Sequence, residues 1–349
     1  LRGWVWEAGD AVVRHRVATE LMPTGAAPDR GALVEDLLGC EPVRRWLDRL
    51  VPDFRFSALH GSRPTAFENA MGKLTQLGLR KGMAELDDRV RPFREWLAEA
   101  LEREPGHAFA EFERALVAGL LAAGGYGEDP TVSRVLERRR RTLARHAATE
   151  DYDVYARAED FRGIPKAFAG RPILDPGLLP DGAFRLPWIY DLVGQSAVLP
   201  DLAKRERGRA GDAIGYVLDD RYQALEPGYG ILRAGKRRYY AMGWDVGLPG
   251  WTGFPLSGRP ASMLVQRMVW LARFPTARCH AWFTAGLRHL RSFRTGRGTY
   301  RFPREYLREG ASGYWVTGAY MGLMANRRTK RALEVESTFW MLLLEGAGS

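Results

Sequence analysis

Two adjacent acids, Asp219 and Asp220, close a predicted helix and lead into a segment rich in glycine, aromatic and basic residues. Loops held by a rigid scaffold are where proteins present catalytic and binding side chains, and segment 212–251 has that composition. In a partly dry cavity two neighbouring carboxylates can share a proton, so that one acts as a general acid. The sequence therefore predicts a catalytic role for Asp219 and Asp220. The alternative is structural: both acids bond the following loop, or pair with Arg221 or Arg237.

The side chains around these acids could bind a substrate. Aromatic rings can stabilise a carbocation, stack on a sugar or hold a nucleobase. Arginines on the same loop can grip a diphosphate or a carboxylate. The predicted substrate-binding residues are Tyr229, Tyr239, Tyr240, Trp244, Trp251, Arg237, Arg238 and, from a second basic loop, Arg304.

Metal and nucleotide chemistry are not indicated. The 6 histidines show no His-Glu-x-x-His or other paired-ligand spacing, which disfavours zinc. No phosphate-binding glycine loop follows a strand, and Gly-x-Ser-x-Gly is absent. We therefore expect neither a metal nor a cofactor. His60 precedes a helix start and could serve as a loop base, although a single unpaired histidine is more often structural.

Helical periodicity dominates the elements that must position these residues. Apolar residues recur at helical spacing in segments such as 132–143, with basic residues on the side of the helix that would face solvent. Several helices end at a small residue, cross a short loop and restart at a proline or an acid. Pairing helices across these loops predicts about six antiparallel hairpins. Their approximate ranges are 10–50, 65–103, 108–146, 187–222, 261–294 and 312–346.

Two long connections separate the hairpins, at about 147–186 and 223–260. Connections of this length in a compact fold are usually functional. The nearest approach to strands is segment 231–244, which could form a small hairpin turning through Ala234 and Gly235. A chain of 349 residues could hold two average domains or one large helical domain. The hairpin pattern favours a single domain over 1–349.

Helical hairpins joined by glycine- and aromatic-rich loops resemble an α/α toroid. More narrowly, segments 216–223 (YVLDDRYQ), 228–230 (GYG) and 239–244 (YYAMGW) resemble the uncharacterised bacterial branch of the prenyltransferase and squalene-cyclase repeat superfamily. The resemblance implies an all-α fold with a central cavity, closed at one end and lined by inner helices. It carries no activity with it. Class II terpene cyclases use an Asp-x-Asp-Asp motif, and the nearest matches here, 85–88 and 217–220, lack its first Asp.

Composition limits the classes of partner. A hydrophobic content of 46% excludes global disorder, and a net charge of +10 favours an anionic partner. The two cysteines, Cys40 and Cys279, cannot build a disulfide framework, so a reduced, cytoplasmic location is expected. The longest apolar runs fall far short of the ~20 residues that a membrane span needs.

Together these features predict an α/α-toroid enzyme of the terpene-cyclase or prenyltransferase type, acting on an anionic or isoprenoid-like small molecule in a central cavity. Two alternatives stay open. One is a lyase or hydrolase of acidic carbohydrates, in which arginine neutralises a uronate and tyrosine or histidine moves the proton. The other is a non-enzymatic basic helical-repeat module that binds nucleic acid or an acidic protein, with an affinity that falls steeply with salt. The sequence does not indicate an oligomeric state.

Overall fold

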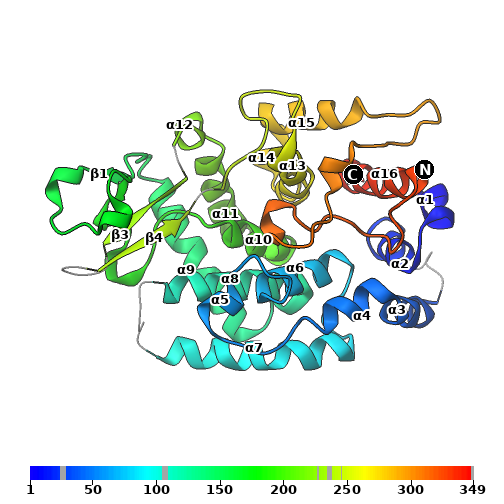
Figure 1. Cartoon of the computed structure of the whole chain (residues 1–349), viewed down its shortest axis with the longest axis horizontal. Helices are drawn as coiled ribbons and strands as arrows, with labels where there is room; N and C mark the ends of the chain where they lie inside the picture. The colour runs from blue at the N-terminus through cyan, green and yellow to red at the C-terminus, as the bar shows by residue number, and fades with distance from the viewer. Residues whose placement is uncertain (24–28, 104–108, 226–227, 234–237, 245, 347–349) are drawn as a thin grey trace.

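A computed structural model describes residues 1–23, 29–103, 109–225, 228–233, 238–244 and 246–346. This part of the chain is predominantly helical, as predicted (Figure 1). The helices of the first half are α1 (Arg2–Ala8), α2 (Ala11–Glu20), α3 (Arg30–Gly39), α4 (Glu41–Leu47), α5 (Phe56–Leu59), α6 (Phe67–Gln76), α7 (Ala84–Glu102), α8 (Ala110–Leu121) and α9 (Pro130–Ala147). Those of the second half are α10 (Ile189–Val198), α11 (Lys204–Val217), α12 (Asp220–Gln223), α13 (Gly258–Leu271), α14 (Pro275–Cys279), α15 (Ala281–Arg291) and α16 (Lys330–Gly346).

The helices divide into a buried set and a covering set. Every residue of α6 and of α8 is buried, whereas α7 buries only the stripe Leu86, Val90, Phe93 and Leu97. The buried helices follow one another in space: α6 packs on α8, α8 on α10, α10 on α13, α13 on α16, and α16 on α2. Helices with one apolar stripe, among them α7, α9 and α11, pack outside them. The two ends of the chain meet where α1 packs on α16 (Figure 1).

Helices α8 and α10 approach closely because two glycines face each other. A Cβ atom on Gly119 would lie 2.4 Å from the carbonyl oxygen of Tyr190, and one on Gly194 would lie 2.9 Å from the Cα of Gly119. No side chain fits in either place. This close contact fixes the position of Tyr190 along the axis of α8.

Five of the six predicted hairpins correspond to groups of consecutive helices. These groups are α2 to α4, α6 with α7, α8 with α9, α10 with α11, and α13 to α15. The sixth prediction, 312–346, is wrong, because only α16 is an α-helix there and residues 312–329 form turns around a short 3₁₀ segment, Trp315–Thr317. Gly318, with φ of 70°, ends that segment so close to α13 that a Cβ atom would lie 2.0 Å from the Ser262 carbonyl oxygen.

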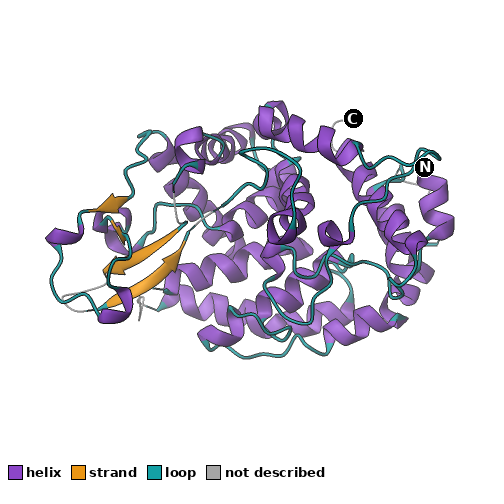
Figure 2. Ribbon diagram, turned by 45° about the horizontal axis from the view of Figure 1, so that its top comes forward, coloured by secondary structure: helices purple, strands orange, loops and turns teal. Residues whose placement is uncertain are grey.

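A four-stranded sheet corrects the all-α prediction locally. Its strands are β1 (Tyr155–Ala156), β2 (Ile173–Leu174), β3 (Tyr229–Arg233) and β4 (Tyr239–Gly243), in that spatial order. Strand β2 runs parallel to β3 and the other pairs are antiparallel. The sheet forms a lobe at one end of the molecule (Figure 2).

The predicted strand hairpin in segment 231–244 is confirmed by β3 and β4, although its turn residues Ala234 and Gly235 lie outside the described residues. The two-residue strands β1 and β2, within the first long connection, are too short to leave a period in the sequence. In the described part of the chain, no helix combines the length and the apolar character needed to cross a membrane.

Candidate active site

His60, Glu68 and Tyr190 meet where α6 and α10 begin. His60 caps the short helix α5, Glu68 is the second residue of α6, and Tyr190 is the second residue of α10. The Nδ1 atom of His60 lies 3.0 Å from Oε1 of Glu68 and 3.2 Å from the hydroxyl of Tyr190, which donates to Oε2 of the same carboxylate. Glu68 is 0% exposed and His60 is 30% exposed. A buried carboxylate is thus joined to a histidine that reaches solvent.

Backbone contacts hold this arrangement in place. The Gly61 N–H donates to Oε1 of Glu68 over 2.8 Å. The Asn69 side-chain amide donates to the carbonyls of Gly61 and Arg63 over 2.8 and 2.7 Å, which fixes the turn that follows His60. Glu68 also lies in the first turn of α6, where the helix dipole favours a negative charge. The carboxylate is therefore held ready as a hydrogen-bond acceptor.

A buried ion pair fixes the start of α10. Arg139 of α9 and Asp191 of α10 are 1% and 3% exposed, and the guanidinium donates to both carboxylate oxygens over 2.9 and 2.8 Å. Arg139 also donates to the carbonyls of Phe184 and Leu186, and Asp191 accepts the N–H of Trp188 over 2.9 Å. These bonds tie the end of the first long connection to α9, and so set the position of Tyr190.

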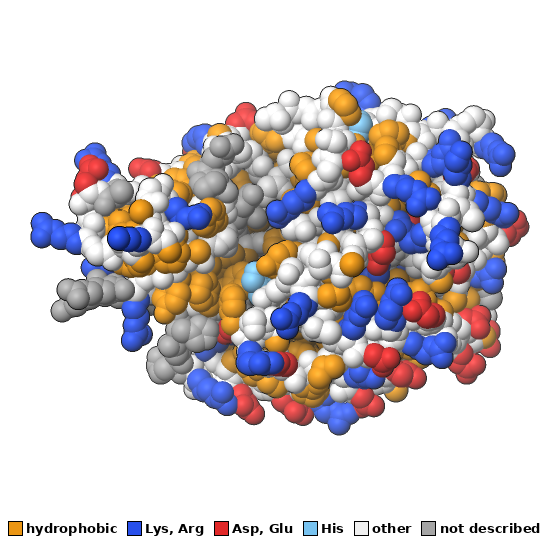
Figure 3. All heavy atoms as spheres, in the orientation of Figure 1, with side chains coloured by type: hydrophobic (Ala, Val, Ile, Leu, Met, Phe, Trp, Pro, Cys, Tyr) orange, Lys and Arg blue, Asp and Glu red, His pale blue; other side chains and the backbone are white. Residues whose placement is uncertain are grey.

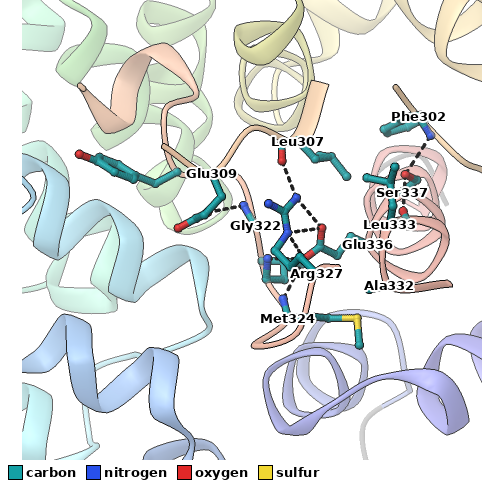
Figure 4. A network of polar contacts seen from close by, with 12 residues as sticks. Phe302, Leu307, Glu309, Gly322, Met324, Arg327, Ala332, Leu333, Glu336 and Ser337 are labelled. Atoms are coloured by element: carbon teal, nitrogen blue, oxygen red, sulfur yellow. Dashed lines mark hydrogen bonds and ion pairs between the residues drawn. The ribbon is translucent and has the colours of Figure 1, made fainter. Parts of the chain in front are cut away.

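A second polar network fastens the segment that carries Tyr314 (Figure 4). Glu336 of α16 is 0% exposed and accepts from Arg327 and from two backbone N–H groups of segment 309–324. Lys73 of α6, itself 2% exposed, donates to Glu309 and to two carbonyls of the same segment. Because these buried charges are paired and bonded, we assign this network a structural role.

Aromatic rings form a wall around His60. Its ring centroid lies 5.2 Å from that of Phe112, 5.1 Å from that of Tyr314 and 5.8 Å from that of Phe56. The surface in Figure 3 is hollowed between the sheet lobe and the helical body, and hydrophobic side chains gather there. Tyr240 of β4 reaches the same wall, because its ring packs edge-on against Phe109, which packs against Phe56. Tyr240 is the predicted binding residue that the structure connects to this wall.

The geometry assigns different chemical roles to the three groups. Burial is the main cause that raises the pKa of Tyr190 well above its ordinary value, and the Glu68 carboxylate is the next. The hydroxyl therefore stays protonated and acts as a hydrogen-bond donor to Glu68. A carboxylate facing Nδ1 of His60 favours the tautomer with the proton on Nδ1. The Nε2 atom then carries the lone pair and has no partner within the described residues. A base oriented by a carboxylate is the arrangement used in general acid–base catalysis.

The two predicted catalytic acids lie elsewhere. Asp219 caps α12 by accepting the Arg221 N–H over 2.8 Å, and it forms a two-bond ion pair with the same guanidinium at 2.9 and 2.8 Å. Hydrogen bonding to Arg221 is the main cause that lowers the pKa of Asp219 to about 2. Asp220 is exposed and accepts from the Trp251 indole N–H over 3.1 Å. The structural alternative, pairing with Arg221, is therefore what Asp219 does.

The remaining predicted residues are dispersed over the lobe and beyond it. Among the described members of the set, Trp251 is the residue hydrogen-bonded to one of the two acids, Asp220. Arg237 lies outside the described residues. Tyr239 is buried and donates to the Arg162 carbonyl, Trp244 is 1% exposed in the core, Tyr229 is half-buried beside Arg171, Arg238 is exposed, and Arg304 is exposed and donates to the Arg328 carbonyl.

Sequence reasoning noted His60 as a loop base but missed Glu68 and Tyr190. The sequence carries no clear signal for Glu68, because α6 (FENAMGKLTQ) mixes apolar and polar side chains in the pattern typical of an amphipathic helix, whose polar residues would be expected in solvent. Tyr190 left no signal, since it lies 122 residues from Glu68 in the chain. Within the described residues, no group of three or more histidines, cysteines or acids is placed to hold a metal ion.

Comparison with known proteins finds no matching family model, no matching curated protein and no matching solved structure. No likeness to a known protein assigns a function, so the geometry of the site carries it.

Proposed function

We propose that this protein is an enzyme in which His60 moves a proton to or from a small molecule bound in the aromatic hollow. The observation that carries the proposal is the buried Glu68 carboxylate bonded to Nδ1 of a histidine whose Nε2 has no partner in the described chain. A purely structural histidine would be expected to bond through both nitrogens or to lie in an apolar core. A module that only binds nucleic acid would not require this pair.

We propose an α/α toroid as the scaffold. Its support is the order of helix contacts, in which buried α6, α8, α10, α13, α16 and α2 follow one another and amphipathic helices pack outside them. Such a ring would close through α3 and α4, since α2 packs on α3, α3 on α4, and α4 on α6. The His60 site would then lie at the end of the ring where α6, α8 and α10 begin.

In the proposed reaction, Nε2 of neutral His60 accepts a proton from the bound substrate. The positive charge that forms on the imidazole is stabilised by the Glu68 carboxylate, which also keeps the ring oriented. Tyr190 holds the second carboxylate oxygen and acts as a positioning residue. The hydroxyl of Tyr314, whose ring faces His60, would donate to the oxygen on which charge develops. The imidazolium then returns its proton to the leaving group.

We place acidic carbohydrates ahead of isoprenoids as the substrate class. Cyclase chemistry begins with protonation by a strong acid, and Asp219, with a pKa of about 2, is ionised near neutral pH. Removal of a proton by histidine, with tyrosine as donor, is instead the chemistry of a carbohydrate lyase. A sugar face can stack on an exposed ring such as that of Phe56, and Arg63, exposed on the turn after His60, would neutralise a uronate.

The test is turnover of a panel of uronate-containing oligosaccharides, followed through the ultraviolet absorbance of the unsaturated product and through reducing ends. We expect His60→Asn to lower kcat by ~10²- to 10⁴-fold with little change in KM, as for loss of a general base. His280→Asn is the matched control, because asparagine also caps a helix where His280 caps α15. Activity of His60→Asn within threefold of wild type would refute the assignment of the base, and a wild-type protein inert toward the whole panel would refute the substrate class.

A further inference from the structure

A second cavity, of about 650 Å³, opens where the buried helices end. Its walls come from the last turns of α2, α6, α10, α13 and α16. Glu68 and Tyr190 lie at the opposite, amino-terminal ends of α6 and α10. The volume falls within the range of small-molecule sites in proteins, ~300 to 1,000 Å³.

Trp315 separates this cavity from the candidate active site. Its backbone N–H donates to Oδ1 of Asn69, beside Glu68, and its indole N–H donates to Oε1 of Gln76, which lines the cavity. These two partners are seven residues apart on α6, which corresponds to ~10 Å along a helix. The cavity is therefore a site distinct from the hollow around His60.

Cations outnumber acids in the cavity wall, where four arginines (Arg2, Arg16, Arg80 and Arg273) face Glu20 and Glu345, and Glu345 is paired with Arg291. Arg16, Arg80 and Arg273 surround one carboxylate, Glu20. Burial would raise the pKa of Glu20, but Arg16, followed by Arg80 and Arg273, holds that pKa below its ordinary value. Glu20 pairs with Arg16 through two bonds of 2.6 and 2.8 Å. Within this cluster, one carboxylate is therefore the counter-ion of three guanidinium groups.

Two of these guanidinium groups keep donors that the protein does not use. Arg16 is 4% exposed, and its Nη1 has no hydrogen-bond partner among the described residues. Arg273 is exposed and has no ion pair within the described chain. Arg80 differs, because its Nη1 is bonded to the carbonyls of Thr75 and Leu79 at the end of α6, where the helix dipole is negative. Arg16 and Arg273 are thus the groups left to meet an anion.

The rest of the wall suits an apolar body. Trp270 and Trp315 lie with their ring centroids 5.3 Å apart, and Trp340 adds a third indole whose buried N–H has no partner among the described residues. Buried Oε1 of Gln266 is likewise without a partner there. Indole faces, an unused N–H and an excess of guanidinium groups favour a ligand that is apolar at one end and anionic at the other.

We infer that this cavity binds an organic anion with an apolar body, for which a medium-chain carboxylate or phosphate monoester is the simplest form. The head group meets Arg16 and Arg273, with Arg80 beside them, and the body lies against the tryptophans. The site is independent of the reaction proposed for His60.

The test is calorimetric titration of the full chain with decanoate, decyl phosphate, decanol and acetate, the first two below their micellar concentrations and decanol below its solubility limit. We expect one molecule of decanoate or decyl phosphate to bind per chain, and the neutral and the tail-less probes to bind at least about tenfold more weakly, because charge-assisted hydrogen bonds and apolar burial each contribute. The two anionic probes decide between a carboxylate and a phosphate. Decanol binding as tightly as the anions, or no binding of either anion, would overturn the inference.

Variants locate the head group. Arg273→Gln should weaken binding of the anion about tenfold, since one charge-assisted contact is lost. It should fold normally, because the side chain is exposed and unpaired in the described structure. Arg297→Gln, an exposed arginine away from the cavity, is the matched control and should bind as the wild type does. Equal affinity of the two variants would place the anion elsewhere and refute the site. His60→Asn should bind the anion unchanged, which separates this result from that of the proposed enzyme reaction.

Discussion

The buried pair of Arg139 and Asp191 makes the sharpest stability prediction. Both side chains are at most 3% exposed, so replacing Asp191 by Asn leaves a buried guanidinium without its main counter-ion. Breaking such a pair costs ~3 to 5 kcal/mol. Glu111 lies 3.5 Å from Nη1 of Arg139 and supplies a partial substitute, which places Asp191→Asn near the lower end of that range, at about 3 kcal/mol.

Replacing the arginine of the pair should cost more than replacing the aspartate. Arg139→Met removes the shared partner of two carboxylates, Asp191 and Glu111, and leaves the carbonyls of Phe184 and Leu186 without a donor. We expect about 5 kcal/mol, because two buried carboxylates then lose their shared guanidinium and two carbonyls lose a donor, although Asp191 and Glu111 each keep a backbone N–H. The order of the two variants is therefore part of the prediction.

Urea unfolding followed by far-ultraviolet circular dichroism and by tryptophan fluorescence measures both costs, and agreement of the two probes checks that the transition is two-state. The control is Glu137→Gln, which breaks an exposed pair with Arg141 on the same helix and should cost no more than ~0.5 kcal/mol. If Asp191→Asn cost as little as this control, the pair would not be dry, and its role in positioning Tyr190 would be refuted.

Two further changes test the assignments of particular residues. Asp219→Asn keeps the helix cap but removes a carboxylate whose folded pKa, about 2, lies below its ordinary 3.8. Above about pH 4 the wild type should therefore be more stable than the variant, by less than ~1 kcal/mol because the side chain is partly solvated. This advantage should be lost as the pH falls toward 2. Urea unfolding at pH 7 and pH 3 measures the difference, and an unchanged difference would contradict the pairing with Arg221. Gly72→Ala would bring a Cβ atom to 2.3 Å from the ring of Trp315, at a cost of ~1 to 3 kcal/mol. Gly208→Ala is the control: at this exposed position of α11 the added Cβ meets no atom within 4 Å, and the change should stabilise by up to ~1 kcal/mol. Thermal melts compare the two, and equal melting temperatures would place Trp315 elsewhere.

The helical content was readable from the sequence because it is a local property. In α7, apolar residues at 86, 90, 93 and 97 recur at the helical period, and the structure buries these four. The turns of segment 312–329 were misread as a helix because its position depends on distant partners. Lys73 and Glu336 supply the hydrogen bonds that hold that segment in an irregular path. The sequence around either residue does not predict these bonds.

The candidate site divides in the same way. The cap formed by Asp219 depends on residues two positions away, and pairing with Arg221 was among the alternatives the sequence offered. His60 was noticed for its place in a loop. Its partner Tyr190 could not be found, because nothing in a single sequence relates positions 60 and 190 before the helices pack.

The sequence by itself determined the predominance of helices, the approximate extent of five groups of consecutive helices, a strand hairpin and an excess of positive charge, since periodicity, capping and composition act over a few residues. Only the tertiary structure decided which polar groups became buried together. It joined Glu68 to His60 and Tyr190, left Asp219 as a cap, and gathered Arg16, Arg80 and Arg273 around Glu20. The physical reason is that desolvation and charge pairing depend on distances across the fold, which the order of residues along the chain does not contain.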